Sequence, residues 1–259
     1  MSLLANDPDR VWEQLGATDP YYAVLTDSRY RGELAPPDRA AFFQSGADHL
    51  EHVLAIIRDR LDPAFAPYRA LDFGCGVGRI LVPLAERCAE VTGVDVSPAM
   101  LAEARRNCEV AGARHVRLVR SDDQLSAVEG DLDLIHTYIV LQHIPVRRGE
   151  RLVEQLAARL APGGVGIFHV TYAHAPTATY RRLLYWLRTR VPGAHAMLNL
   201  ALGRSPGEPL MQGNRYSATR LLDLLWRAGC AEVHVRFSDH QGHRGVLLFA
   251  RRSAASVFL

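Results

Sequence analysis

Residues 71–79 decide the fold, and they read Leu71-Asp72-Phe73-Gly74-Cys75-Gly76-Val77-Gly78-Arg79. The alternating glycines lie between an apolar run, Ala70–Phe73, that predicts a strand and a run, Ile80–Arg87, that predicts a helix. Glycine tolerates backbone angles that other residues avoid, and it leaves room for a ligand against the main chain. The spacing G-x-G-x-G differs from the dinucleotide pattern G-x-G-x-x-G, and Asp72 would attract a cationic amino group but repel a pyrophosphate. The stretch therefore predicts a ligand-binding loop and disfavours a nicotinamide-dependent oxidoreductase.

A second acidic residue, Asp95, ends the next predicted strand, Val91–Asp95. A carboxylate at the end of the second strand of such a sheet can accept hydrogen bonds from both hydroxyls of a ribose. Asp95 taken alone leaves two alternatives open, a cap on the helix that follows and a solvated turn residue. The glycine loop upstream favours the ribose-binding role.

The pattern from about residue 69 onward alternates between strand and helix, which is typical of an α/β fold with a doubly wound parallel sheet. The second helix, Pro98–Ala111, has the clearest start, because Ser97 is a favoured N-cap residue and proline is favoured at the first helical position. The remaining predicted elements are strands at Val116–Val119 and Leu132–Ile139, a helix at Arg148–Leu160, a turn at 161–164, a strand at Val165–Val170, a helix from Ser217 to Ala228, and strands at Glu232–Phe237 and Gly245–Ala250.

Two segments lie outside this alternation. The N-terminal one predicts a helical extension, in which Ala40–Arg60 is the longest candidate helix. The other is an insertion too long for an ordinary connecting loop, and its apolar spacing at Tyr180–Leu187 predicts a helix. We expect the insertion to form a lid over an acceptor site, with an oligomer interface as the alternative. The chain thus divides into an extension at 1–60, the cofactor half of the core at 61–170, the inserted lid at 171–215, and the completion of the core at 216–259.

The composition excludes several classes of function. The formal net charge is +2, so the sequence lacks the strong positive charge that is typical of nucleic-acid-binding proteins. All 30 basic residues are arginine, and without a lysine the chain cannot form a Schiff base or complete a Walker phosphate loop. His240 and His243 have no third ligand near them in the sequence, so we expect no metal.

The cysteines and the apolar runs indicate in which cellular compartment the protein resides. Four scattered cysteines without paired spacing favour a reducing environment and predict a cytoplasmic protein. Charges within the first ten residues do not fit a signal peptide. The uncharged run Leu160–Tyr180 has the length of a membrane span, but its prolines, glycines, histidines and threonines do not suit one. We therefore expect no membrane partner.

Five motifs in order resemble those of the class I S-adenosylmethionine-dependent methyltransferases, over roughly residues 69–170 and 216–251. The glycine loop and Asp95 match the first two, and Asp122 matches an aspartate that contacts the adenine amino group. The stretch from Asp133 to Pro145 and the turn from Leu160 to Gly164 match the others. The resemblance implies a seven-stranded Rossmann-like sheet of order 3-2-1-4-5-7-6 with an antiparallel last strand. It also implies S-adenosylmethionine across the carboxyl ends of strands one, two and four, with S-adenosylhomocysteine as the product.

The resemblance further implies which residues bind the cofactor. The stretch Trp12–Gly46 resembles an extension of bacterial small-molecule members, in which residues before the core close over the cofactor. The expected cofactor-binding residues are Asp72, Gly74, Cys75, Gly76, Gly78, Asp95, Val96, Met100, Asp122, Asp123, Thr137 and Tyr138.

The expected activity is methyl transfer from this cofactor to an oxygen, nitrogen or carbon of a small metabolite. A sulfonium methyl is already activated, so the protein mainly has to align the acceptor, although a protonated acceptor also needs a base. His143, after the fourth strand, is the first candidate for that base, with helix capping as its alternative role, and His169 and Tyr172 are further candidates. A non-catalytic protein that binds the cofactor as a sensor or scaffold is the alternative function. A homodimer is possible.

Overall fold

The structure is a computed structural model, and it describes residues 7–174, 184, 186–188, 190–203, 205–240 and 242–254. Most of the helix predicted at Tyr180–Leu187 lies outside these residues, although residues 186–188 are helical. The uncharged run that begins at Leu160 starts as a strand. Among the helices that the structure describes, none combines the length and the apolarity needed to cross a membrane.

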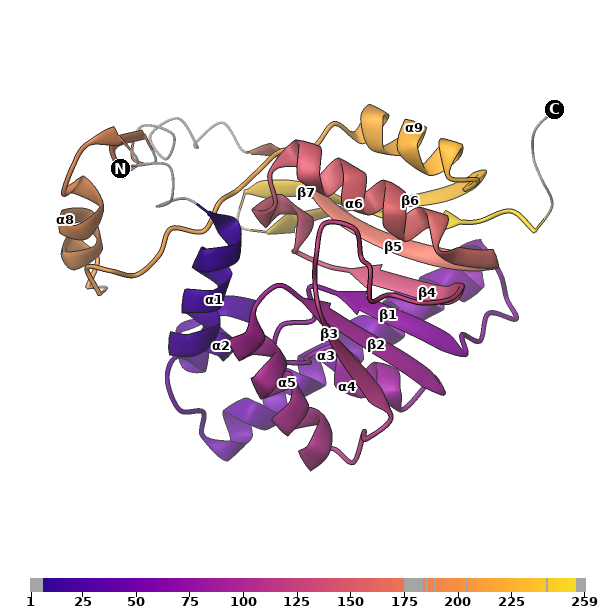
Figure 1. The fold of residues 1–259 in the computed structure, drawn as a ribbon, viewed down its shortest axis with the longest axis horizontal. Coiled ribbons are helices and arrows are strands. Elements are labelled where there is room, and N and C mark those ends of the chain that lie inside the picture. Colours follow the sequence, from indigo (N-terminus) through magenta and orange to yellow (C-terminus); the bar gives the residue numbers. More distant parts are fainter. Residues whose placement is uncertain are drawn as a thin grey trace.

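A seven-stranded sheet forms the centre of the molecule (Figure 1). Its strands lie in the order β3-β2-β1-β4-β5-β7-β6, in which β7 is antiparallel to both of its neighbours and the others run parallel. This order is the one that the resemblance implies, so the predicted fold class is confirmed. The strands are β1 (Arg69–Phe73), β2 (Glu90–Asp95), β3 (Val116–Arg120), β4 (Leu132–Thr137), β5 (Leu160–His174), β6 (Glu232–His240) and β7 (His243–Arg251).

Helices cover both faces of this sheet (Figure 1). Successive side chains of a strand point to opposite faces, so Ile135 of β4 packs with α6 and α9 whereas Leu134 packs with α3 and α4. The central strands are therefore apolar on both sides, as in a fully covered parallel sheet. The helical elements are α1 (Pro8–Thr18), α2 (Pro20–Val24), η1 (Ser28–Tyr30), α3 (Pro36–Arg60), α4 (Leu81–Ala85), α5 (Pro98–Val110), η2 (Leu141–His143), α6 (Val146–Ala158), α8 (Ala194–Ala201) and α9 (Ala218–Arg227).

Several element boundaries differ from the sequence-based expectation. The helix α4 begins later than predicted, and Pro83 gives a reason, because proline has no N–H to bond the carbonyl of the fourth residue before it. The strand β4 ends at Thr137 rather than at Ile139, whose φ of 60° bends the chain. The strand β5 is much longer than Val165–Val170, because antiparallel pairing with β7 continues to His174 and Leu160 pairs with Leu132 before the predicted turn.

The N-terminal extension packs on the cofactor half of the core. In α1, an oxygen of Glu13 accepts hydrogen bonds from the Ser97 hydroxyl at 2.6 Å and from the Ala99 N–H at 3.2 Å, at the start of α5. The long helix α3 crosses the end of the glycine loop at Gly46, where a Cβ would come within 2.0 Å of the Arg79 carbonyl oxygen. A glycine is thus required at this helix crossing.

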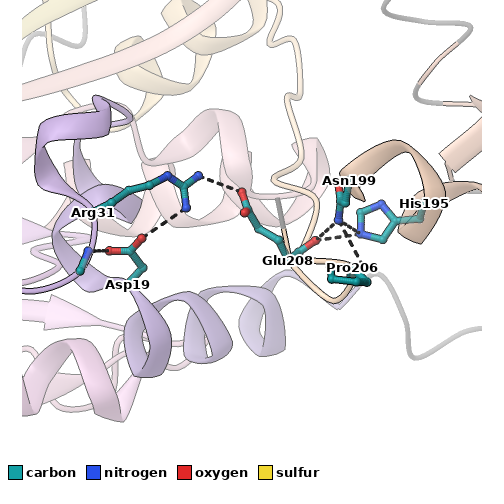
Figure 2. A network of polar contacts seen from close by, with 7 residues as sticks. Asp19, Arg31, His195, Asn199, Pro206 and Glu208 are labelled. Atoms are coloured by element: carbon teal, nitrogen blue, oxygen red, sulfur yellow. Dashed lines mark hydrogen bonds and ion pairs between the residues drawn. The ribbon is translucent and has the colours of Figure 1, made fainter. Parts of the chain in front are cut away.

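The inserted segment is tied to the extension by a polar network, although α8 itself stands away from the sheet, beyond α1 (Figures 1 and 2). Arg31 donates hydrogen bonds to Asp19 at 3.4 Å and to Glu208 at 3.2 Å. Asn199 of α8 donates to the carbonyl oxygen of Glu208 at 3.0 Å. The two segments that lie outside the α/β alternation therefore contact each other as well as the core.

Candidate active site

A cavity of about 1640 Å³ opens at the carboxyl ends of β1, β2 and β4, where a doubly wound sheet binds its ligands. Its walls come from the glycine loop, the end of β2, residues 138–144 after β4, the N-terminal extension and the inserted segment. A drug-sized ligand commonly occupies a pocket of about 300–1,000 Å³. The cavity therefore has room for two small molecules at once.

The glycine loop is shaped by three residues with positive φ, Gly74 at 75°, Gly76 at 51° and Gly78 at 90°. This left-handed region of backbone conformation is energetically unfavourable for residues with a Cβ but not for glycine. A Cβ on Gly74 would also come within 2.3 Å of Val140, and one on Gly76 within 2.7 Å of Val24. The first two glycines thus bring the main chain close to both walls of the cavity.

Asp95 joins the glycine loop to the start of α5. One of its oxygens accepts the N–H of Gly76 and the other accepts the N–H of Ser97, each at 2.9 Å. Burial raises the pKa of this carboxyl to about 6, although the two backbone hydrogen bonds oppose the rise. Each carboxylate oxygen can accept more than one hydrogen bond, so Asp95 retains acceptor capacity toward the cavity that it lines.

Asp72 is part of a buried chain of three side chains. Its Oδ1 lies 2.8 Å from Nδ1 of His136, which is 1% exposed, and Nε2 of His136 lies 3.0 Å from Nε2 of His49 on α3. Because a carboxylate only accepts, Nδ1 of His136 carries the proton of this hydrogen bond. Burial, followed by the charge of His136, lowers the pKa of His49 to about 2, so His49 is neutral.

His143 ends η2 and faces the cavity from the other side. Its Nδ1 lies 2.7 Å from the carbonyl oxygen of Gln212 in the inserted segment, so Nδ1 donates and Nε2 is left as an acceptor. The side-chain nitrogen of Gln142 lies 3.3 Å from that Nε2. Trp12 of α1 packs edge-on against the imidazole, at 5.0 Å between ring centroids. This enclosure lowers the pKa of His143 to about 4, with burial as the main cause.

His169 and Tyr172 on β5 lie outside the lining of the cavity. His169 is fully buried behind Tyr138 and His240, which both line the cavity and whose rings are 5.0 Å and 5.2 Å from its own. Its Nε2 lies 2.9 Å from the hydroxyl of Ser238, and burial lowers its pKa to about 3. Tyr172 instead packs against Phe237 at the surface.

The residues predicted to bind the cofactor fall into two groups. Those that line the cavity are Asp72, Gly74, Cys75, Gly76, Asp95, Val96, Met100 and Tyr138. Those that do not are Gly78, Asp122, Asp123 and Thr137.

In the second group, Asp122 and Asp123 bind other parts of the protein through their side chains, whereas the Thr137 hydroxyl has no hydrogen-bond partner in the described part of the chain. Asp122 accepts the backbone N–H groups of Gln124 and Ser126, both at 3.0 Å, and Asp123 pairs with Arg148 at 2.5 Å. Thr137 is buried, and its hydroxyl has no hydrogen-bond partner among the residues described. The roles predicted for these residues toward the cofactor stay predictions.

The cavity is also lined by His136, Arg79 and Gln142, which were not predicted as site residues. The signal that identifies His136 is its pairing with Asp72 in adjacent parallel strands. The two side chains therefore lie on the same face, beside each other. Recognising this required the register of β1 against β4, which neither stretch of sequence contains by itself.

The fold is a doubly wound sheet with a glycine loop after β1 and an acid at the end of β2. Residues 70–164 match a family model described as a methyltransferase domain. Trans-aconitate 2-methyltransferase from Methylobacterium nodulans is 38% identical over 213 residues, which cover 76% of this chain and 72% of that protein. The chain belongs to the class I S-adenosylmethionine-dependent methyltransferases.

Other relatives are matched over less of their length. The chain spans 64% of an uncharacterized methyltransferase from Synechocystis at 30% identity, and 51% of a ubiquinone biosynthesis O-methyltransferase from Xanthomonas axonopodis at 33% identity. Among solved structures, magnesium protoporphyrin IX methyltransferase from Synechocystis with bound S-adenosylhomocysteine has a TM-score of 0.63 at 18% identity, over 95% of this chain and all of that one. The N-methyltransferase NodS from Bradyrhizobium japonicum has a TM-score of 0.57 over 95% of this chain and 98% of its own.

The residues present fit the cofactor of this family. Gly74 and Gly76 let the main chain lie against Val140 and Val24 in the cavity wall. Asp95 and Asp72 both line the cavity, where their carboxylates would suit the ribose hydroxyls and the amino group of the methionine part. Among the described residues there is no cluster of three or more side chains that could hold a metal ion.

Replacing Asp95 by asparagine should weaken the binding of S-adenosylhomocysteine at least about tenfold, because one charge-assisted hydrogen bond contributes about 1.5–3 kcal/mol. Isothermal titration calorimetry at pH 7.5 measures this change. Asp223→Asn, on the exposed face of α9, is the matched control and should bind normally. Unchanged affinity in a folded Asp95→Asn protein would remove Asp95 from the cofactor site.

The free energy of unfolding should fall as the pH is lowered from 6.5 toward 5. The pKa values of His49, His143 and His169 are about 2, 4 and 3 in the folded protein, so below pH 6.5 only the unfolded chain takes up their protons. Each such histidine contributes a slope of about 1.4 kcal/mol per pH unit. Asp95 acts in the opposite sense, because its raised pKa lets the folded protein bind a proton first, between about pH 6 and 4.

Urea unfolding between pH 7 and pH 5 tests this balance. The histidines should outweigh Asp95, and His169→Gln should make the pH dependence shallower by about 1.4 kcal/mol per pH unit. Equal stability at pH 7 and pH 5 would show that these histidines are not held neutral by burial.

Proposed function

We propose that the chain transfers the methyl group of S-adenosylmethionine to an oxygen, nitrogen or carbon atom of a small metabolite. The observation that carries this proposal is a cavity that combines a part suited to the cofactor with a second part suited to an acceptor. The glycine loop and Asp95 lie at one end, and Tyr138, Gln142, His143 and residues of the inserted segment line the rest. A protein that only stored or sensed the cofactor would not need the second part.

The chain's own contribution is binding, alignment and the exclusion of water. When bound, the cofactor supplies a methyl group already activated by its sulfonium. Asp95 and the glycine loop would hold the nucleoside end, and Asp72, fixed by His136, would face the amino group. The extension contributes Trp12, Val24 and neighbouring residues to the wall, which limits the access of water. Alignment of two bound reactants can lower a barrier by about 7–11 kcal/mol in favourable cases.

His143 is the candidate base for an acceptor that arrives protonated. Its Nδ1–H donates to Gln212, so the lone pair that could accept a proton is on Nε2, where the Gln142 amide nitrogen lies 3.3 Å away. With a pKa lowered to about 4, the imidazole is neutral above that pH but is a weak base. Because a base works best with a pKa near the operating pH, this histidine suits an acidic acceptor, and an acceptor that arrives deprotonated would need no base.

We also propose that the insertion at 171–215 is a lid over the acceptor. Support comes from Leu184, Arg188, Leu202 and residues 210–215, which line the cavity. The hydrogen bond from His143 to Gln212 connects this segment to the candidate base. An oligomer interface is the alternative, and a homodimer, a cytoplasmic location and the absence of a nucleic-acid partner all stay predictions.

The names of two similar proteins support a small acceptor. Trans-aconitate 2-methyltransferase and magnesium protoporphyrin IX methyltransferase each carry the name of a small molecule. The competing function, a cofactor-binding sensor or scaffold, requires no acceptor at all.

Incubation of the protein with methyl-labelled cofactor and fractionated small metabolites tests the proposal, with mass spectrometry to detect labelled products. His143→Gln should lower kcat by about 10²-fold or more if the acceptor needs a base, with the affinity for S-adenosylhomocysteine within a few-fold of normal. The acid limb of kcat/KM should then lie near pH 4. Cofactor binding without a labelled product in any fraction would favour the sensor instead.

A further inference from the structure

Five arginines line the cavity, and they differ in their hydrogen-bond and ion-pair partners. Arg29 pairs with Asp27 at 3.1 Å, and Arg79 donates to the Ser45 hydroxyl at 3.4 Å. Arg148 lies between Asp9 and Asp123, at 2.6 Å and 2.5 Å. Among the described residues, Arg188 and Arg215 have no carboxylate within ion-pair distance. Both belong to the inserted segment.

The backbone on either side of Arg215 is fixed to the core. Asn214 donates through its backbone N–H to the carbonyl oxygen of Gln142 at 2.6 Å, and through its side chain to the same oxygen at 3.2 Å. The N–H of Tyr216 donates to the carbonyl oxygen of Thr171 on β5 at 2.8 Å. Arg215, an exposed residue, therefore has a defined place between η2 and the end of β5 and is one of the residues that line the cavity.

Arg188 approaches the same cavity from the helical residues 186–188. Its Nε is buried and has no hydrogen-bond partner among the residues described. A buried N–H of a guanidinium without an acceptor destabilises the folded protein. A ligand that brings an acceptor to this atom would remove that cost.

The carboxylates that line the cavity already have other contacts. They are Asp9 and Asp27, which pair with arginines, Asp72, which lies against His136, and Asp95 and Asp239, which accept backbone N–H groups. Arg188 and Arg215 have no such ion pair among the described residues, and a bound sulfonium would add a further positive charge to the cavity. An acceptor with a negative charge would pair with these two guanidinium groups, whereas a cationic amine would not.

We propose that the acceptor is a small carboxylic acid and that Arg188 and Arg215 bind its carboxylate. This inference rests on the proposed function, since it names the acceptor class of that same site. A guanidinium forms paired hydrogen bonds with a carboxylate or a phosphate group. A phosphomonoester offers similar paired acceptor oxygens, so it is the competing anion that the experiment has to distinguish from a carboxylate.

Calorimetry on the full chain saturated with S-adenosylhomocysteine provides the test. The probes are a set of small mono-, di- and tricarboxylic acids, the neutral amides of the same acids, and simple phosphomonoesters. At least one acid should bind, and its amide should bind at least tenfold more weakly. Arg188→Gln and Arg215→Gln should each reduce the affinity for that acid at least tenfold while leaving the affinity for S-adenosylhomocysteine unchanged. Arg227→Gln, on the exposed part of α9, is the control and should change neither.

Several results would overturn the inference. These are equal binding of an acid and its amide, binding of phosphomonoesters but of no acid, and acid binding that persists in the Arg188→Gln, Arg215→Gln double variant. Labelled methyl transfer to neutral or basic acceptors only would also overturn it, while the proposed function stood. Arginine-dependent binding of an acid with no methyl transfer to any acceptor would support the anion site and reject the proposed function.

Discussion

The carboxylate of Asp95 holds together the edge of the sheet on which the site depends. Its two oxygens accept N–H groups from Gly76 and Ser97, so the end of β2, the glycine loop after β1 and the first turn of α5 are joined through one side chain. The backbone of the loop is thereby fixed in a conformation that only glycine adopts without cost, at Gly74, Gly76 and Gly78. Burial holds the pKa of this acid at about 6, so it is mostly ionised at neutral pH and can accept further hydrogen bonds.

The N-terminal extension extends this arrangement into a closed site. Glu13 accepts hydrogen bonds at the same start of α5 that Asp95 contacts, and Gly46 lets α3 lie directly on the backbone of Arg79 at the end of the glycine loop. The extension then meets the insertion through Arg31 and Glu208 (Figure 2). The extension and the insertion thus enclose one cavity, and burial lowers the pKa values of His143 and His240, which line it.

Local patterns predicted the elements of the core, because strand and helix periodicity, the glycine spacing and the Ser97 cap are all encoded within short stretches. The strand order came from the resemblance and was confirmed by the structure. The hydrogen bond between Asp72 and His136 could not be predicted in this way, since it depends on how β1 and β4 align. Asp122 differs, because its carboxylate accepts N–H groups of its own turn, a local contact that the motif match did not consider. The length of β5 also depended on a distant partner, β7.

A crystal structure of the protein with bound S-adenosylhomocysteine tests the central claim most directly. The account predicts that the ribose hydroxyls lie within hydrogen-bond distance, about 2.7–3.2 Å, of the Asp95 oxygens. It also predicts that the sulfur faces the part of the cavity lined by Tyr138 and His143, with Arg188 and Arg215 beyond it. A cofactor bound elsewhere, or one whose ribose does not contact Asp95, would contradict it.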